Sequence, residues 1–146
     1  MAGPRSVRFD SDTEEHLVAF VARHAGLTQS SAAAMLVEEG LRMDAHPGVL
    51  FREGPAGRRA VLAGGPDVWE AIRAIRSARE SDPTLTAAET LELVAENTSL
   101  DSRTLQIAVA YYSEYPHEVD SLIATAEEAE VGATAAVERR QALLGS

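Results

Sequence analysis

The first 45 residues combine one strand-like pattern with two short helical patterns, and a single chain cannot bury the apolar faces of all three. Residues 5–9 alternate polar and apolar side chains with a period of two, which predicts a short strand with Val7 and Phe9 on one face and Ser6 and Arg8 on the other. A lone strand needs a neighbour to pair with. A two-fold related copy of the chain is the simplest source of that neighbour, so we expect a homodimer.

Two helices are predicted to follow this strand. Residues 10–12 (Asp-Ser-Asp) supply helix caps, and an apolar stripe with helical spacing follows at Leu17, Phe20, Val21 and His24. Gly26 predicts the turn between the helices, and Thr28 or Ser30 starts the second one, which ends at residues 46–48. The predicted inner face of the second helix consists of Ala33, Leu36, Val37 and Leu41.

Residues 47–146 read as a second domain with a hairpin followed by four helices. The two strands flank the turn at residues 54–57, and the helices are predicted from Pro66 to Ser77, from Thr86 to Glu96, from residue 101 or 102 to 113, and over 117–143. The residues predicted to face inward on these helices are Val68, Trp69, Ile72, Ile75, Leu91, Val94, Ala95, Leu105, Ala108, Val109, Tyr112, Val119, Leu122, Ile123 and Ala126. The fold class is therefore mainly α, with residues 1–46 and 47–146 as its two domains.

Charge is distributed unevenly along the chain. The total is −10, but residues 46–79 carry six arginines against three acidic residues, whereas residues 80–146 carry three arginines against thirteen acidic residues. This balance argues against indiscriminate binding of nucleic acid. The absence of cysteine excludes disulfides and thiol chemistry and fits a reducing cytoplasm. No apolar run approaches the roughly 18 residues of a membrane span.

Nothing in the sequence points to catalysis. The four histidines share no metal-ligand motif, residues 64–66 (Gly-Gly-Pro) form a turn rather than a phosphate loop, and consecutive acid pairs such as Glu38 and Glu39 diverge on a helix. We therefore expect no enzyme activity, no metal and no cofactor.

Residues 7–43 (VRFDSDTEEHLVAFVARHAGLTQSSAAAMLVEEGLRM) resemble the ribbon-helix-helix fold of CopG/Arc-type repressors and antitoxins. The resemblance implies that the strands of two chains form a ribbon in the major groove of double-stranded DNA. The implied base contacts are Ser6, Arg8 and Arg5, and the implied phosphate contacts are Thr28, Gln29, Ser30 and Ser31. The implied dimer core contains Val7, Phe9, Leu36 and Leu41. A ribbon used only for dimerisation is the alternative.

Residues 57–123 are similar to a small helical domain found in antitoxins that pair with PIN-type RNase toxins. The resemblance implies a helix-turn-helix at residues 87–96 and 102–113 and a toxin protein as partner. Because Arg103 is the single cation on its second helix, we expect this motif to dock a protein or to serve a purely structural role. Further candidate contacts to DNA or to a partner are Arg58, Arg59, Arg73, Arg76 and Arg79, with pairing inside the chain as the alternative.

Together these features predict a sequence-specific DNA-binding transcriptional regulator, in the form of an antitoxin and autorepressor. The alternative from another class is a dimeric protein-interaction adaptor whose ribbon serves assembly only.

Overall fold

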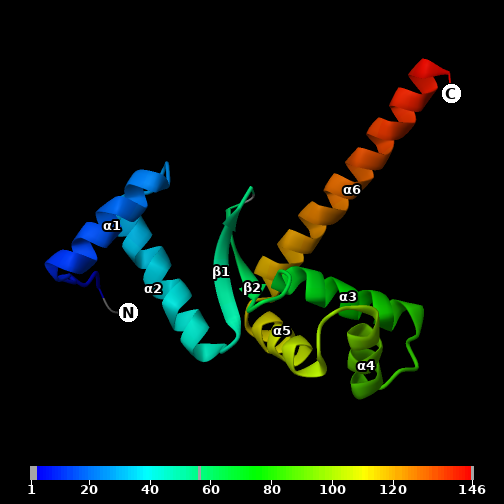
Figure 1. Ribbon diagram of the computed structural model, residues 1–146, viewed down its shortest axis with the longest axis horizontal. Coiled ribbons are helices and arrows are strands. Elements are labelled where there is room, and N and C mark those ends of the chain that lie inside the picture. Colours follow the sequence, from blue (N-terminus) through cyan, green and yellow to red (C-terminus); the bar gives the residue numbers. More distant parts are fainter. Residues whose placement is uncertain (1–2, 56, 146) are drawn as a thin grey trace. The chain divides into compact units, whose positions relative to one another are not determined.

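Six helices and one two-stranded hairpin make up the part of the chain that the computed structural model describes, residues 3–55 and 57–145 (Figure 1). They divide into two units, Met1–Ala45 and His46–Ser146. The mainly helical class expected from the sequence is confirmed. Among the described residues, no helix combines the length and apolar character that a bilayer span requires.

Unit 1 is a pair of helices, α1 (Ser11–Arg23) and α2 (Gln29–Ala45). Asp10 caps α1, because its carboxylate accepts a hydrogen bond of 2.7 Å from the amide of Thr13. The turn depends on Gly26, whose φ of +89° lies in the left-handed region that favours glycine. Thr28 caps α2 by accepting a 3.1 Å hydrogen bond from the amide of Ser31.

The predicted N-terminal strand is not formed in the single chain, and the one hairpin described follows the two helices instead. Residues 3–10 are exposed and belong to no helix or strand. The physical reason is that a strand is defined by its pairing, and the described chain contains no neighbour for this segment. We call residues 3–10 the N-terminal arm.

The predicted inner face of α2 is only partly buried. Ala33 and Leu36 are half-buried, whereas Val37 and Leu41 are exposed and Ala32 is the apolar residue that is fully buried. Helical spacing therefore identified an apolar face correctly, but in the single chain most of that face is not covered.

Unit 2 begins with the hairpin of β1 (Val49–Gly54) and β2 (Gly57–Leu62), which confirms the strands expected on both sides of the turn. Val49 pairs with Leu62, and Phe51 pairs with Ala60, so these four side chains share one face of the hairpin. Val49, Ala60 and Leu62 belong to the buried core, and Phe51 packs against it.

Four helices complete unit 2: α3 (Val68–Ser81), α4 (Ala87–Asn97), α5 (Ser102–Glu114) and α6 (Pro116–Leu144). Thr86 and Glu89 form the expected capping box at the start of α4. Pro66 was predicted in the first turn of α3, and this is wrong, because Asp67 is the N-cap and Pro66 lies before it. The carbonyl of Pro66 instead accepts a 2.9 Å hydrogen bond from the amide of Leu62 at the end of the hairpin.

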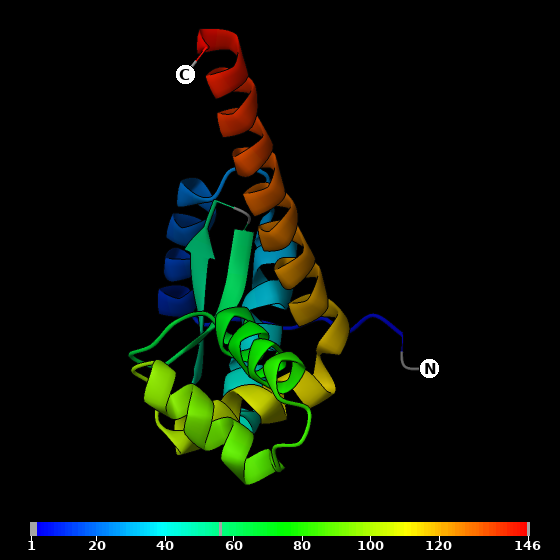
Figure 2. The same cartoon turned by 90° about the vertical axis from the view of Figure 1, so that its right-hand side faces the viewer.

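The core of unit 2 collects one face from each of these elements. The fully buried residues of α5 are Leu105, Ala108 and Tyr111, whereas Val109 is exposed and Tyr112 is half-buried, which corrects the predicted inner face. The centre of the face lies at Tyr111 because α5 packs against α3 and the hairpin together. On α6, Val119 and Ile123 are buried as predicted, and the helix then continues beyond the core, as both views show (Figures 1 and 2).

Candidate nucleic-acid interface

The N-terminal arm lies against an open apolar hollow between α1 and α2. The hollow has a volume of about 550 Å³, and its walls include Val7 and Phe9 from the arm, Leu17 from α1, and Ala33 and Val37 from α2. Val7 is 69% exposed and Phe9 is 39% exposed in the single chain. The arm therefore places two apolar side chains beside an apolar groove that they do not fill.

Ser6 and Arg8 alternate with these apolar residues, and Arg5 precedes the alternation. Arg5, Ser6 and Arg8 are all exposed. Within residues 3–55 and 57–145, no ion pair engages either Arg5 or Arg8. Both guanidinium groups are thus available to an anionic ligand, and a guanidinium suits the paired acceptors of a guanine edge or a phosphate.

The start of α2 is a second place where an anion could bind. The first amides of a helix have no partner inside the helix, and α2 carries no acidic residue in its first turn, whereas α1 carries Asp12 and Glu14. The side chains of Thr28 and Ser31 hydrogen-bond the amides of each other. All four residues 28–31 are exposed, as contact with a phosphate would require.

The arginines of unit 2 are arranged differently, because most of those singled out from the sequence are engaged inside the unit. Arg73 forms a two-pronged pair with Glu130, with both distances at 2.7 Å. Arg76 pairs with Asp120 and donates a 2.7 Å hydrogen bond to the hydroxyl of Tyr112. The remaining contacts join Arg59 to Asp67 and Arg79 to the carbonyl of Leu85.

These pairs change the ionisation of their members. The hydrogen bond from Arg76 lowers the pKa of the Asp120 carboxyl below its ordinary value, and Glu130 raises the pKa of Arg73 above its ordinary value. Both pairs join α3 to α6 across 44 and 57 residues of sequence. The geometry of these arginines therefore matches the intramolecular alternative.

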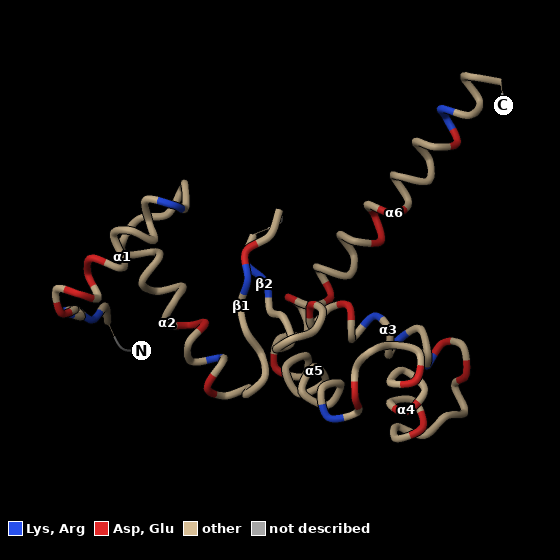
Figure 3. The backbone as a smooth tube through the Cα atoms, viewed as in Figure 1, with Lys and Arg blue, Asp and Glu red and all other residues tan. Residues whose placement is uncertain are grey.

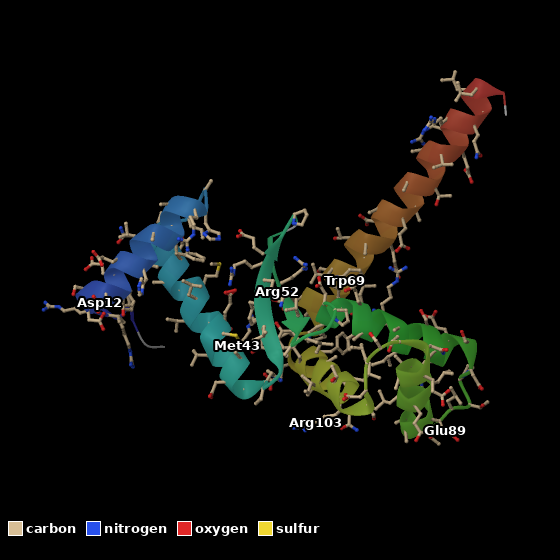
Figure 4. The ribbon with its side chains drawn as sticks, viewed as in Figure 1. Asp12, Met43, Arg52, Trp69, Glu89 and Arg103 are labelled. Carbon is tan, nitrogen blue, oxygen red and sulfur yellow. The ribbon has the colours of Figure 1, made fainter. Side chains whose placement is uncertain are left out.

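Helices α4 and α5, joined by residues 98–101, occupy the predicted helix-turn-helix positions. Arg103 is exposed at the start of α5 (Figure 4), but Glu89, Glu92 and Glu96 are exposed on α4. The charge map shows acidic residues along α4 and α6 (Figure 3). Phosphate neutralisation dominates affinity for DNA, so this surface is a poor match for the DNA backbone.

Sequence reasoning missed the burial of three polar side chains among the described residues, which are Glu39, His46 and Thr90. His46 was interpreted only as part of a helix break, yet it is 7% exposed, lies beside the rings of Tyr111 and Tyr115, and has its Nε2 atom 3.2 Å from a carboxylate oxygen of Glu114. Local sequence carries no signal for this contact, since the residues are 68 apart. Among the described residues, no group of histidines and carboxylates could hold a metal ion.

Comparison of the chain with models of protein families, with curated proteins and with solved structures returns no match.

Proposed function

We propose that the protein is a DNA-binding transcriptional regulator that acts as a two-fold symmetric dimer of the ribbon-helix-helix type. The observation that carries the proposal is the N-terminal arm, whose apolar residues Val7 and Phe9 remain exposed beside the hollow between α1 and α2. Antiparallel pairing of two arms would bury these residues against both helix pairs. It would leave Ser6 and Arg8 on the opposite face of the ribbon, where they could meet the edges of bases.

The small core of unit 1 supports the same conclusion. Leu17 and Ala32 are its buried apolar residues among those described, whereas Val7, Phe9, Val18, Val37 and Leu41 are exposed. A chain segment of 45 residues with so little buried apolar surface is marginal alone. Dimerisation supplies the missing burial, and Leu36 and Leu41 of α2 would join the interface.

DNA contacts are assigned to unit 1 and not to unit 2. The base contacts are Ser6 and Arg8 on the outer face of the ribbon, together with Arg5 at its start. Residues 28–31 would contact phosphates that flank the ribbon, chiefly through the amides of Gln29 and Ser30, because the amides of Thr28 and Ser31 already bond each other's side chains. In unit 2, Arg59, Arg73 and Arg76 are held by carboxylates of the same unit, and Arg103 stands near acidic residues. Unit 2 is then free to dock a protein, as an autorepressing antitoxin requires.

The alternative function is a dimeric adaptor whose ribbon serves assembly only. The observation in its favour is charge, because residues 1–45 carry four arginines against seven acidic residues. The two functions differ in one measurable property, which is a preference for a particular DNA sequence.

The test is fluorescence anisotropy of the full chain with DNA from upstream of its gene and with a scrambled duplex of the same composition. We expect the upstream DNA to bind more tightly, and we expect Arg8→Ala to abolish that preference. One lost arginine–base contact costs about 1–3 kcal/mol, and the symmetry applies the loss twice. The dimer should persist, since Arg8 lies on the outer face.

Two matched variants control for loss of charge elsewhere. Arg42→Ala removes an arginine that pairs with Glu38 on the same helix, and Arg103→Ala removes the exposed cation of α5. Neither should change the preference. Equal binding of both duplexes by a dimeric wild-type protein would contradict the proposed regulator function and favour the adaptor. Loss of the sequence preference in Arg103→Ala alone would assign recognition of the DNA sequence to unit 2.

A further inference from the structure

Helix α6 continues well past the core that its first turns help to build (Figures 1 and 2). Its last buried residue is Ile123, and the helix ends at Leu144. At 1.5 Å per residue, residues 127–144 form a projection about 27 Å long. A helix of this length with so few tertiary contacts is marginal in water, so we expect this projection to be covered in an assembly.

The face that α6 buries in the core continues along the projection. Val119, Leu122 and Ile123 lie on that face inside the unit, and apolar residues recur at the same three- and four-residue spacing beyond it. We call this continuation the α6 stripe, and its members are Ala126, Ala129, Ala133, Ala136, Val137 and Leu144. Val137 is 54% exposed and Leu144 is 67% exposed.

We propose that the α6 stripe is covered by the α6 stripe of a second copy of this chain, with the two helices antiparallel. The charges at the stripe define this arrangement. Glu130 lies near the N-terminal end of the α6 stripe, and Arg140 lies near its C-terminal end. A two-fold axis at the level of residue 135 places each Glu130 opposite Arg140 of the second copy. A parallel pair would instead bring Glu130 to Glu130 and Arg140 to Arg140, where like charges repel.

The sizes of the side chains fit the same axis. With the two-fold axis at residue 135, Ala133 meets Val137 of the second copy and Ala126 meets Leu144 of the second copy, so a small residue lies opposite a larger one in both cases. Small residues opposite large ones allow two helices to interdigitate. A single position of the two-fold axis, at residue 135, therefore brings opposite charges together and places small side chains opposite larger ones.

In this arrangement, the body of unit 2 provides a binding site for the C-terminal end of α6 of the second copy. A hollow of about 400 Å³ adjoins the base of the projection, and its walls include Trp69, Leu122, Ala126 and Ala129. Figure 4 shows Trp69 near the base of α6. Because Leu144 of the second copy arrives at the level of Ala126, its side chain would enter this hollow and contact the indole.

Glu130 is already positioned for the charge pair. The two hydrogen bonds from Arg73 hold its carboxylate, yet the side chain remains 59% exposed. Each carboxylate oxygen has two acceptor sites, so Arg140 of the second copy can bind without displacing Arg73. Arg73 is thereby assigned to the assembly of the protein and not to DNA. This interface involves only unit 2, so it stands or falls independently of the ribbon in unit 1.

The first experiment uses disulfide cross-linking, which is clean here because the chain has no cysteine of its own. The full-length variant Ala126→Cys/Leu144→Cys should form a disulfide between residue 126 of one chain and residue 144 of another on mild oxidation, identified by peptide mass spectrometry. The matched control is Ala124→Cys/Ala142→Cys, which places thiols at similar levels on the opposite face and should link far less. Single Ala126→Cys should not link to itself.

The second experiment compares two neighbouring charge reversals in the full chain by sedimentation velocity. In a Phe9→Asp background, where the N-terminal arms cannot pair, Arg140→Glu opposes Glu130 of the second copy and should halve the sedimenting mass. Arg139→Glu makes the same change away from the stripe and should leave the mass unchanged. Three results would overturn the proposal. They are 126–144 linkage no greater than in the control pair, 126–126 linkage in the single variant, which indicates parallel helices, and an unchanged mass when Arg140→Glu is added to Phe9→Asp. A stripe that serves a different protein would give the first and third of these results.

Discussion

Replacing Val7 by alanine tests whether the N-terminal arms pair across a two-fold axis. The substitution removes two methylene equivalents, each of which contributes about 0.8 kcal/mol when buried. Val7 is 69% exposed in the single chain, so about two thirds of that contribution becomes available only on association. This amounts to about 1 kcal/mol per chain and about 2 kcal/mol per dimer, which corresponds to a dissociation constant about 30-fold weaker.

The chain provides a closely matched control for this substitution. Val131 is 70% exposed, and it lies on α6 away from the α6 stripe, so Val131→Ala removes the same atoms from an equally exposed site. Both variants are measured by sedimentation velocity over a dilution series, in the Arg140→Glu background so that association through α6 does not contribute. Val131→Ala should leave the dissociation constant within a factor of about two.

Two outcomes would contradict the reasoning about the arm. If Val7→Ala and Val131→Ala weaken association equally, the arm lies outside the interface between the chains. If the Arg140→Glu protein is monomeric before any change at Val7, unit 1 does not dimerise and the ribbon is not formed.

Two further predictions concern the stability of unit 2, followed by the fluorescence of Trp69, the single tryptophan. Leu105 is fully buried, so Leu105→Ala should lower the free energy of unfolding in a denaturant titration by about 2–5 kcal/mol, whereas Leu143→Ala on the exposed end of α6 should change it by less than about 0.5 kcal/mol. The Arg76 guanidinium lowers the pKa of the folded-state Asp120 carboxyl, so the stabilisation from this pair is present above the ordinary aspartate pKa and is lost as pH falls through the lowered value. Wild-type stability should therefore decline more steeply than that of Asp120→Asn on acidification through that range, and identical slopes would show that the pair does not contribute.

Local sequence patterns predicted those elements whose signals lie within a few residues. The capping box of Thr86 and Glu89 marks the start of α4, and the Gly-Pro-Ala-Gly segment at 54–57 separates two strands that pair in the structure. Each signal works because the interacting groups are three or four residues apart, so the chain needs no further information to place them.

Contacts between distant segments could not be predicted in this way. Tyr111 and Tyr112 both fit the periodicity of an amphipathic helix, and Tyr111 is the buried one because it packs near Phe51 and donates a 2.6 Å hydrogen bond to Glu118. The pairing of Arg73 with Glu130 spans 57 residues and has no periodicity to reveal it. The strand predicted at the N-terminal arm is wrong for a different reason, since its alternating pattern needs a neighbouring strand and the described chain provides none for residues 3–10.

The pair between Arg73 and Glu130 also divides α6 into two segments whose backbone amides should exchange with solvent at different rates. Backbone amides between Pro116 and Ala126 belong to turns packed on the core, so their exchange with solvent deuterium requires opening of unit 2 as a whole. In the single chain, α6 beyond Glu130 is held only by its own hydrogen bonds, so we expect its amides to exchange at rates set by local fraying. A single continuous helix therefore contains a slow and a fast segment, with a guanidinium–carboxylate fork at the boundary, and any partner that covers the second segment converts it to slow exchange without changing the fold.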